Sequence, residues 1–298
     1  MSVRPDWSRV TRATYRVRQH YRYEYTGAVW DLHQRLVMIP PDKHGDQRLL
    51  QHDLEIRGTE GDHTTSWERD AFGNRVARVV ANRVPVAIDF EATYRVERSA
   101  TPLGLTGPAP WTSPAGRLDY VRPTALTAPD RRLIDQAEVI ARRSADGHER
   151  AEWAHEWTAG AIEYQYGITG YTTPAAMALH LGKGVCQDYA HILLALLRML
   201  NVPCRYVSGQ MLGDGAAHAW VEALIDCPGG QVETVAYDPT HRRRARMDYL
   251  TVAVGRDYAD ISPTSGTYSG PAAGRISSTK RAEAVEIEMA PGATEAVA

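Results

Sequence analysis

The amino-acid sequence predicts an α+β protein with a β-sandwich-like first domain and a second domain that mixes helices and strands. Apolar residues alternate with polar ones from Tyr15 to Tyr25 and again from Val84 to Val96, which is typical of strands that bury one face. Beyond residue 130 the apolar residues recur at helical spacing, and strand-like patterns return after residue 203. A chain of 298 residues is long enough for about two domains.

The composition argues against several classes of function. The formal net charge is −2 and the sequence pI is about 6.6, so we expect neither nucleic acid nor a membrane surface as a partner. The longest apolar run, 192–197, is too short to span a bilayer, and the first seven residues lack the apolar core of a secretory signal. The three cysteines are too few for a disulfide framework. We therefore expect a cytoplasmic protein.

The chain divides into four regions by composition and pattern. Shorter strand candidates and turn residues complete the first region and favour a sandwich. A proline- and glycine-rich stretch is predicted to connect the two domains. The regions are a β-rich domain at 1–100, a connector at 101–129, a core at 130–270, and a C-terminal strand with a flexible tail at 271–298.

Helix and strand signals follow one another in the predicted core. Thr127 is a candidate N-cap for a helix that begins near Pro129, and Thr173 is a candidate N-cap before Pro174. A helix from Cys186 to Leu200 is apolar nearly all round, so we expect it to be the central buried helix. The remaining predictions are a helix at 149–161 and strands at 204–212, 217–225, 231–237 and 285–289.

Cys186 lies where a glycine-containing turn meets the start of that buried helix. Unpaired backbone N–H groups and the positive end of the helix dipole stabilise a thiolate at such a position. The same N–H groups can stabilise the oxyanion of an acyl group under attack. Taken alone, Cys186 also fits a buried, protonated structural cysteine.

A nucleophilic cysteine needs a base and a group that orients the base. His218 begins one predicted strand and Asp238 ends the next, and adjacent antiparallel strands bring such positions together. His218 alone also fits a surface or hydrogen-bonded histidine, and Asp238 alone fits a turn residue. The three residues together indicate a catalytic triad in the order Cys, His, Asp.

The second half of the chain resembles the bacterial transglutaminase-like superfamily in a series of ordered motifs. These are 184–191 (GVCQDYAH), 205–209 (RYVSG), 218–222 (HAWVE), 237–240 (YDPT) and 252–260 (VAVGRDYAD). In the first domain, the segment 70–74 (DAFGN) and the tyrosine-rich first strand resemble the β-rich region that accompanies this core. The resemblance extends over about residues 11–270.

The resemblance implies a papain-like core, as in cysteine proteases and transglutaminases, with Cys186 as nucleophile, His218 as general base and acid, and Asp238 as the residue that orients His218. It also implies acyl transfer through a thioester: the thiolate attacks an amide carbonyl, the imidazolium protonates the leaving amine, and an amine or water then takes the acyl group.

Other residues near the motifs are weaker candidates. We take Trp220, Tyr166 and Tyr171 as candidate substrate contacts, although Trp220 fits a packing role equally well. Tyr164 and Gln165 are further candidates for the acyl site or the oxyanion hole, and the sequence does not choose among them. The sequence contains no Cys-x-x-Cys pair, Walker loop or dinucleotide fingerprint, so we expect neither a metal nor a cofactor.

The expected function is therefore cysteine-dependent acyl transfer on glutamine or peptide amides, with a protein or peptide as substrate and an amine as one acceptor. Hydrolysis of the same thioester, as in a peptidase or amidase, is the alternative, because the outcome depends on how well the cleft excludes water. A peptide-binding module without chemistry, and an assembly role for the edge strands of the first domain, are further alternatives. The sequence predicts no oligomeric state.

Overall fold

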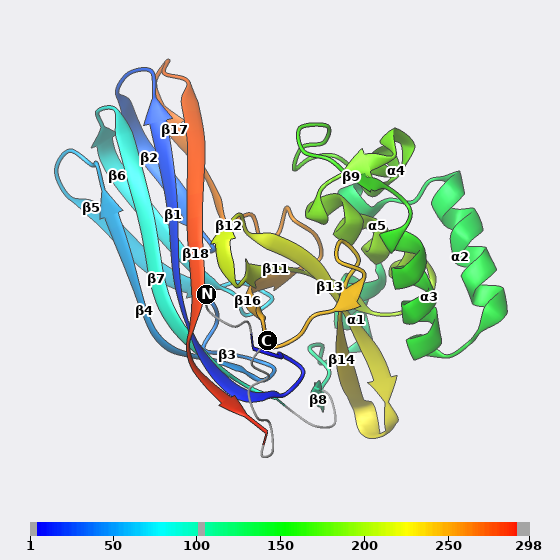
Figure 1. Ribbon diagram of the computed structural model, residues 1–298. Helices are drawn as coiled ribbons and strands as arrows, with labels where there is room; N and C mark the ends of the chain where they lie inside the picture. Colours follow the sequence, from blue (N-terminus) through cyan, green and yellow to red (C-terminus); the bar gives the residue numbers. More distant parts are fainter. Residues whose placement is uncertain (1–4, 101–104, 291–298) are drawn as a thin grey trace.

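The structure, a computed structural model, describes residues 5–100 and 105–290. A β-sandwich and a mixed core of helices and strands lie side by side (Figure 1), which confirms the predicted α+β class. Residues 101–104 of the predicted connector and the predicted flexible tail at 291–298 lie outside the described residues.

The sandwich consists of two antiparallel sheets around a shared hydrophobic core. Its strands are β1 (Val10–Tyr25), β2 (Val29–Leu36), β3 (Lys43–His44), β4 (Gln47–Arg57), β5 (His63–Arg69), β6 (Arg75–Val84), β7 (Ala87–Ser99), β12 (Gly213–Gly215), β17 (Thr264–Ser269) and β18 (Gly274–Met289). One sheet has the order β12-β18-β1-β7-β4-β3 and the other β17-β2-β6-β5. The predicted alternation is clearest in β7, where Ile88, Phe90 and Tyr94 point inward and are at most 1% exposed.

The two C-terminal strands belong to the sandwich. β17 pairs with β2 and β18 pairs with β1, so residues 264–269, which the sequence assigned to the core, lie in the sandwich instead. β18 also begins at Gly274, well before the predicted strand at 285–289. Both strands are mostly exposed and rich in small polar residues, and they therefore lack the apolar alternation that identifies a strand.

The core is a sheet with helices packed around one long helix. Its strands are β8 (Leu105–Pro108), β11 (Cys204–Met211), β13 (His218–Cys227), β14 (Gln231–Asp238), β15 (Arg243–Arg244) and β16 (Tyr249–Gly255), with a separate short pair of β9 (Glu163–Tyr164) and β10 (Lys183–Gly184). Its helices are α1 (Pro114–Val121), α2 (Arg131–Arg143), α3 (Gly147–Ala159), α4 (Ala175–Leu181) and α5 (Cys186–Met199), with short 3-10 turns η1 (Ala125–Thr127) and η2 (Pro228–Gly230). The sheet order is β15-β14-β13-β11-β16, with β8 beside β14.

Helix α5 is the central helix of the core, as its composition predicts. Every residue from Asp188 to Arg198 is buried, and α5 packs against β13 on one side and against α2, α3 and α4 on others. The described part of the predicted connector is folded into the core, because β8 pairs with β14 and α1 packs against α5.

Two predicted helix caps are wrong. Asp130 caps α2, because its carboxylate accepts a hydrogen bond from the backbone N–H of Leu133 at 2.9 Å. Thr127 lies in η1, where its hydroxyl accepts a hydrogen bond from Arg198 Nη1 at 2.6 Å. Helix α4 begins after Pro174 without a side-chain cap.

The sandwich completes the outer edge of the core sheet. β16 is the last strand of that sheet, and two side-chain amides of the sandwich take the place of a further strand. Gln47 donates to the carbonyl of Thr251 at 2.7 Å and accepts from its N–H at 2.9 Å. Asn74 does the same to Val254, at 2.7 and 2.8 Å. The two parts of the chain therefore form one hydrogen-bonded unit.

Candidate active site

Cys186 is the first residue of α5, and the chain reaches it through β10. The turn is held by Asp188, whose carboxylate accepts a hydrogen bond from the backbone N–H of Val185 at 2.7 Å. Gly184 is required here, because a Cβ at this position would lie 2.6–2.8 Å from the Asp188 side chain. Cys186 is half-buried. The N–H of Asp188 already donates to the Val185 carbonyl at 2.8 Å, which leaves the N–H groups of Cys186 and Gln187 as the first-turn donors beside the thiol.

His218 and Asp238 meet as the strand order predicts. β13 and β14 are antiparallel neighbours, and His218 Nε2 lies 2.7 Å from Asp238 Oδ2. The carboxylate is fully buried, while the imidazole is 10% exposed. Because Nε2 faces Asp238, the Nδ1 atom of His218 is the ring nitrogen left for Cys186.

The surroundings favour the imidazolium form of His218. Burial by itself lowers the pKa of His218, but hydrogen bonds with Asp238 and Cys186 and their negative charges outweigh burial and raise this pKa to about 9. Burial likewise raises the pKa of Asp238, but hydrogen bonds from His218, Tyr249 and His241 outweigh it and hold this pKa well below its usual range. Both pKa shifts favour an imidazolium paired with a carboxylate.

Two further side chains, which the sequence did not single out, bind the same carboxylate oxygen. The Tyr249 hydroxyl donates to Asp238 Oδ2 at 2.6 Å, and His241 Nδ1 lies 2.7 Å from this oxygen. Arg243 in turn donates to the Tyr249 hydroxyl at 2.9 Å. The position of His241, three residues after Asp238, was a usable signal, because an Asp-Pro turn folds back on its own side chain. Tyr249 lies on β16, a strand that the sequence did not predict.

Within the described residues, His218, Asp238 and His241 form a group whose ligand-type atoms lie within 4.8 Å of one another. The two nitrogen atoms each lie 2.7 Å from Asp238 Oδ2, which is a hydrogen-bond distance. Tetrahedral ligands about 2.0–2.1 Å from a zinc ion would be ~3.3 Å apart. The group therefore has the spacing of a hydrogen-bonded cluster, and the expectation of no metal stays a prediction.

Trp220, a predicted substrate contact, is a packing residue. Its side chain is 1% exposed and lies against His218 and Tyr249, with ring centroids 6.2 and 5.3 Å away. Gly209 makes room for it, since a Cβ there would lie 2.3 Å from the indole ring. Trp220 therefore supports His218 from within the protein and is not open to a substrate.

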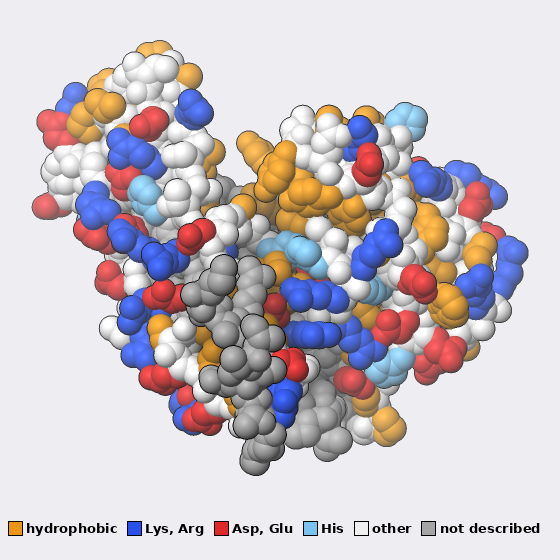
Figure 2. Space-filling view, in the orientation of Figure 1, with side chains coloured by type: hydrophobic (Ala, Val, Ile, Leu, Met, Phe, Trp, Pro, Cys, Tyr) orange, Lys and Arg blue, Asp and Glu red, His pale blue; other side chains and the backbone are white. Residues whose placement is uncertain are grey.

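The other predicted substrate contacts lie in the segment that precedes Cys186 in the sequence. Three exposed tyrosines of this segment, here called the tyrosine rim, are Tyr164, Tyr166 and Tyr171. Tyr164, Tyr166 and Tyr171 are 48%, 70% and 69% exposed. β9 pairs Tyr164 with Gly184, two residues before Cys186, and the backbone N–H of Gln165 donates to the Gly184 carbonyl at 2.9 Å. Figure 2 shows a notch between the sandwich and the core, with hydrophobic side chains gathered on the core side. This rim places tyrosines at the surface near the candidate nucleophile.

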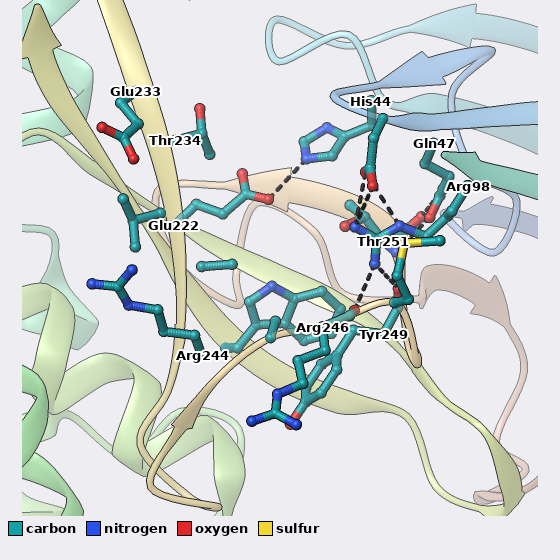
Figure 3. A pocket seen from close by; sticks show the side chains of 16 residues that line it. His44, Gln47, Arg98, Glu222, Glu233, Thr234, Arg244, Arg246, Tyr249 and Thr251 are labelled. Atoms are coloured by element: carbon teal, nitrogen blue, oxygen red, sulfur yellow. Dashed lines mark hydrogen bonds and ion pairs between the residues drawn. The ribbon is translucent and has the colours of Figure 1, made fainter. Parts of the chain in front are cut away.

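A separate pocket, lined in part by Trp220, lies between the sandwich and the core sheet (Figure 3). It has a volume of about 270 Å³, and Tyr249 forms part of its wall. The Glu222 carboxylate there is hydrogen-bonded to His44 at 3.0 Å and to Arg205 at 2.7 Å. Neither Cys186 nor His218 lines this pocket, so it is distinct from the candidate active site.

The fold and the arranged Cys, His and Asp residues define a protein with a cysteine-protease-like core. Residues 135–239 match the family model of the transglutaminase-like superfamily, and residues 15–97 match that of the bacterial transglutaminase-like N-terminal region. Together the matches span more than half of the chain. The chain belongs to the transglutaminase-like superfamily.

The chain is also similar in sequence to uncharacterized proteins and in fold to a solved structure. An uncharacterized protein of Mycobacterium leprae is 36% identical over 165 residues, which are 51% of this chain and 56% of that protein. An uncharacterized protein of Mycobacterium tuberculosis is 28% identical over 290 residues, 85% of this chain and 86% of that protein. The crystal structure of a proposed cysteine protease from Cytophaga hutchinsonii has a TM-score of 0.69 at 17% identity, covering 94% of this chain and 93% of that one.

The short apolar runs of the sequence predict no segment that spans a membrane. In the described part of the chain, no helix is long and apolar enough to cross a membrane.

Proposed function

We propose that this protein is a cysteine-dependent acyl-transfer enzyme that acts on glutamine or peptide amides. The observation that carries the proposal is the imidazole of His218, which is bound to the buried Asp238 carboxylate at 2.7 Å through Nε2 and has Cys186 among the groups that raise its pKa. A nucleophile, a base and an orienting group in this arrangement are what covalent catalysis requires.

In the first step, the Cys186 thiolate attacks the amide carbonyl carbon, a C–S bond forms, and the carbonyl oxygen becomes an oxyanion beside the first-turn N–H groups of α5. The His218 imidazolium then donates its Nδ1 proton to the leaving amine as the C–N bond breaks, and a thioester remains. In the second step, an amine or water attacks the thioester carbon and gives a proton to neutral His218; a C–N or C–O bond forms, the C–S bond breaks, and the amide or acid leaves. The thiolate and the imidazolium are then restored.

Hydrolysis is the second candidate outcome for the thioester. Cys186 is half-buried and the tyrosine rim is open to solvent, so water has access to the site. The similarity to a proposed cysteine protease supports the same outcome. Tyr166 and Tyr171 are the proposed contacts for the polypeptide substrate, because they are the most exposed side chains on the rim.

Acylation by p-nitrophenyl acetate tests the chemistry without knowledge of the natural substrate. In the expected reaction, the acetyl group moves to Cys186 Sγ and p-nitrophenolate leaves in a burst. We expect Cys186→Ala to abolish the burst and His218→Ala to slow it by about 100-fold or more, because general acid–base catalysis contributes factors of this size. Mass spectrometry should locate the acetyl group on the peptide that contains Cys186.

Addition of a primary amine separates the two outcomes, since an N-acetyl amine indicates transamidation and acetate indicates hydrolysis. Equal acylation rates for the unchanged protein and His218→Ala would contradict the proposal. The chain would then be better described as a peptide-binding module.

A further inference from the structure

The buried carboxylate of Asp238 serves two imidazoles rather than one. His218 Nε2 and His241 Nδ1 each lie 2.7 Å from the same oxygen, Oδ2, and the two ring centroids are 5.0 Å apart. The environments of the rings differ, because His218 is 10% exposed and His241 is 44% exposed. The proposed mechanism uses His218 and leaves His241 without a role.

The turn after β14 holds His241 in this position. The other carboxylate oxygen of Asp238, Oδ1, accepts hydrogen bonds from the backbone N–H groups of Thr240 and His241 at 3.0 and 3.3 Å. This is the arrangement of an Asx turn. Arg242 then adopts a left-handed backbone conformation with φ of 53°, and the chain returns along β14 as β15. The His241 ring is thus directed back onto the carboxylate by local geometry.

We propose that His241 is a positioning residue that shares the Asp238 carboxylate with His218 and so limits how strongly that carboxylate holds the His218 proton. This inference rests on the proposed function. A hydrogen bond that His241 donates withdraws negative charge from Oδ2, and less of that charge then stabilises the His218 imidazolium. An imidazolium that is held less tightly gives its proton more readily to the leaving amine, and general acids work best when their pKa lies near the working pH.

The same carboxylate is surrounded by other polar groups, and their contributions must be held constant in a test. By element, the side chains that act on the carboxylate are His218 of β13, Tyr249 of β16 and Arg243 of β15, which donates to the Tyr249 hydroxyl. His155 of α3 lies 3.2 Å from the backbone carbonyl of Asp238, and Cys186 of α5 acts on the His218 side of the pair. None of them needs to change if only His241 is replaced. Because His241 is partly exposed and Asp238 keeps its other donors, substitution at this position should leave the fold intact.

Two variants of His241 separate charge sharing from a steric role. His241→Ala removes the donor, whereas the Nδ2 atom of His241→Asn is as many bonds from the backbone as the imidazole Nδ1 and can donate in its place. We expect the pKa of His218 to rise by on the order of half a unit to one unit in His241→Ala and to return toward the original value in His241→Asn. NMR titration of isotope-labelled histidine rings measures this, with His218→Gln used to assign the signal.

An unchanged His218 pKa in His241→Ala would overturn the inference, as would a shift that His241→Asn fails to reverse. The titration reports on the imidazole whether or not Cys186 reacts. Failure of the acylation test would therefore contradict the proposed function alone, and failure of the titration would contradict the role of His241 alone.

Discussion

At the scale of single residues, the site depends on buried charges that are compensated by hydrogen bonds. Asp238 is fully buried, and its two oxygens accept bonds from three side chains and two backbone N–H groups. A buried carboxylate is tolerated only with such compensation. The charge of His218 is consequently coupled to folding as well as to the proposed chemistry.

This coupling predicts a pH-dependent contribution of His218 to stability. The pKa of His218 is raised from 6.5 to about 9 in the folded protein, so its stabilisation is present in full below about pH 6.5 and is lost as the pH rises through about 9. The free energy of unfolding of the unchanged protein should exceed that of His218→Gln. This difference should be larger below about pH 6.5 than above about pH 9, by up to about 3 kcal/mol. Urea unfolding at several pH values measures the difference. A difference that stays constant over this range would contradict the assignment.

At the scale of elements, the turn from β10 into α5 determines where the thiol lies. Because Gly184 has no side chain, its backbone can lie directly against Asp188. Asp188 is 1% exposed, so its carboxylate has little room to move. The Thr169 hydroxyl also donates to Asp188 Oδ2, at 2.7 Å. The start of α5 and the loop that carries the tyrosine rim are therefore held by one side chain.

Substitution of Gly184 should disturb this turn. We expect Gly184→Ala to destabilise the protein by about 1–3 kcal/mol, because an added methyl group in a filled site forces its neighbours to shift. The variant should also slow Cys186 alkylation. Gly170→Ala is the matched control, since a methyl group there would meet nothing within 4 Å, and it should stay within about 0.5 kcal/mol. Thermal or urea unfolding measures the stability of both variants. Equal stabilities of Gly184→Ala and Gly170→Ala would contradict the role of Gly184.

The elements that the sequence predicted well are those determined by local pattern. The start of β13 at His218 and the end of β14 at Asp238 follow from strand-like apolar runs and from the Asp-Pro turn, and their antiparallel pairing brings the two residues together. The contribution of Tyr249 was missed, because it depends on the pairing of β16 with β11, which the local sequence does not indicate. The packing of Trp220 likewise depends on Gly209 of the neighbouring strand, a contact that its own segment does not indicate.

At the scale of the whole molecule, the sandwich and the core are joined by polar contacts at the edge strand β16. This strand carries Tyr249, which binds Asp238, and its backbone is paired by Gln47 and Asn74 of the sandwich. Lys280 of β18 adds a further link, donating to the carbonyl of Met211 of β11 at 2.7 Å; it also donates to the carbonyl of Gly213 of β12 at 3.0 Å. These bonds join residues far apart in the sequence. The motif at 70–74 could therefore be recognised from the sequence, but the contact of its Asn74 with Val254 could not be predicted.

The interface predicts a large effect of a small change at Asn74. In Asn74→Ala, the N–H and carbonyl of Val254 lose their partners in a buried position, and we expect a loss of about 2–4 kcal/mol of stability, since each buried group left unpaired costs about 1–3 kcal/mol. Asn82→Ala, at an exposed position, should change stability by less than about 0.5 kcal/mol. Urea unfolding tests the pair, and a neutral Asn74→Ala would show that the sandwich does not stabilise β16.

The central claim is that Cys186 and His218 form a reactive thiolate–imidazolium pair, and the pH dependence of alkylation tests it most directly. Iodoacetamide labelling followed by peptide mass spectrometry compares Cys186 with two internal references in the same chain. Cys204 is fully buried, and burial raises its pKa to about 11, whereas Cys227 is partly exposed. We predict that Cys186 alone reacts rapidly below about pH 7 and that His218→Ala abolishes this reactivity. If Cys186 reacts no faster than Cys227 in the folded protein, and a denatured sample shows the thiol to be intact, the account is contradicted.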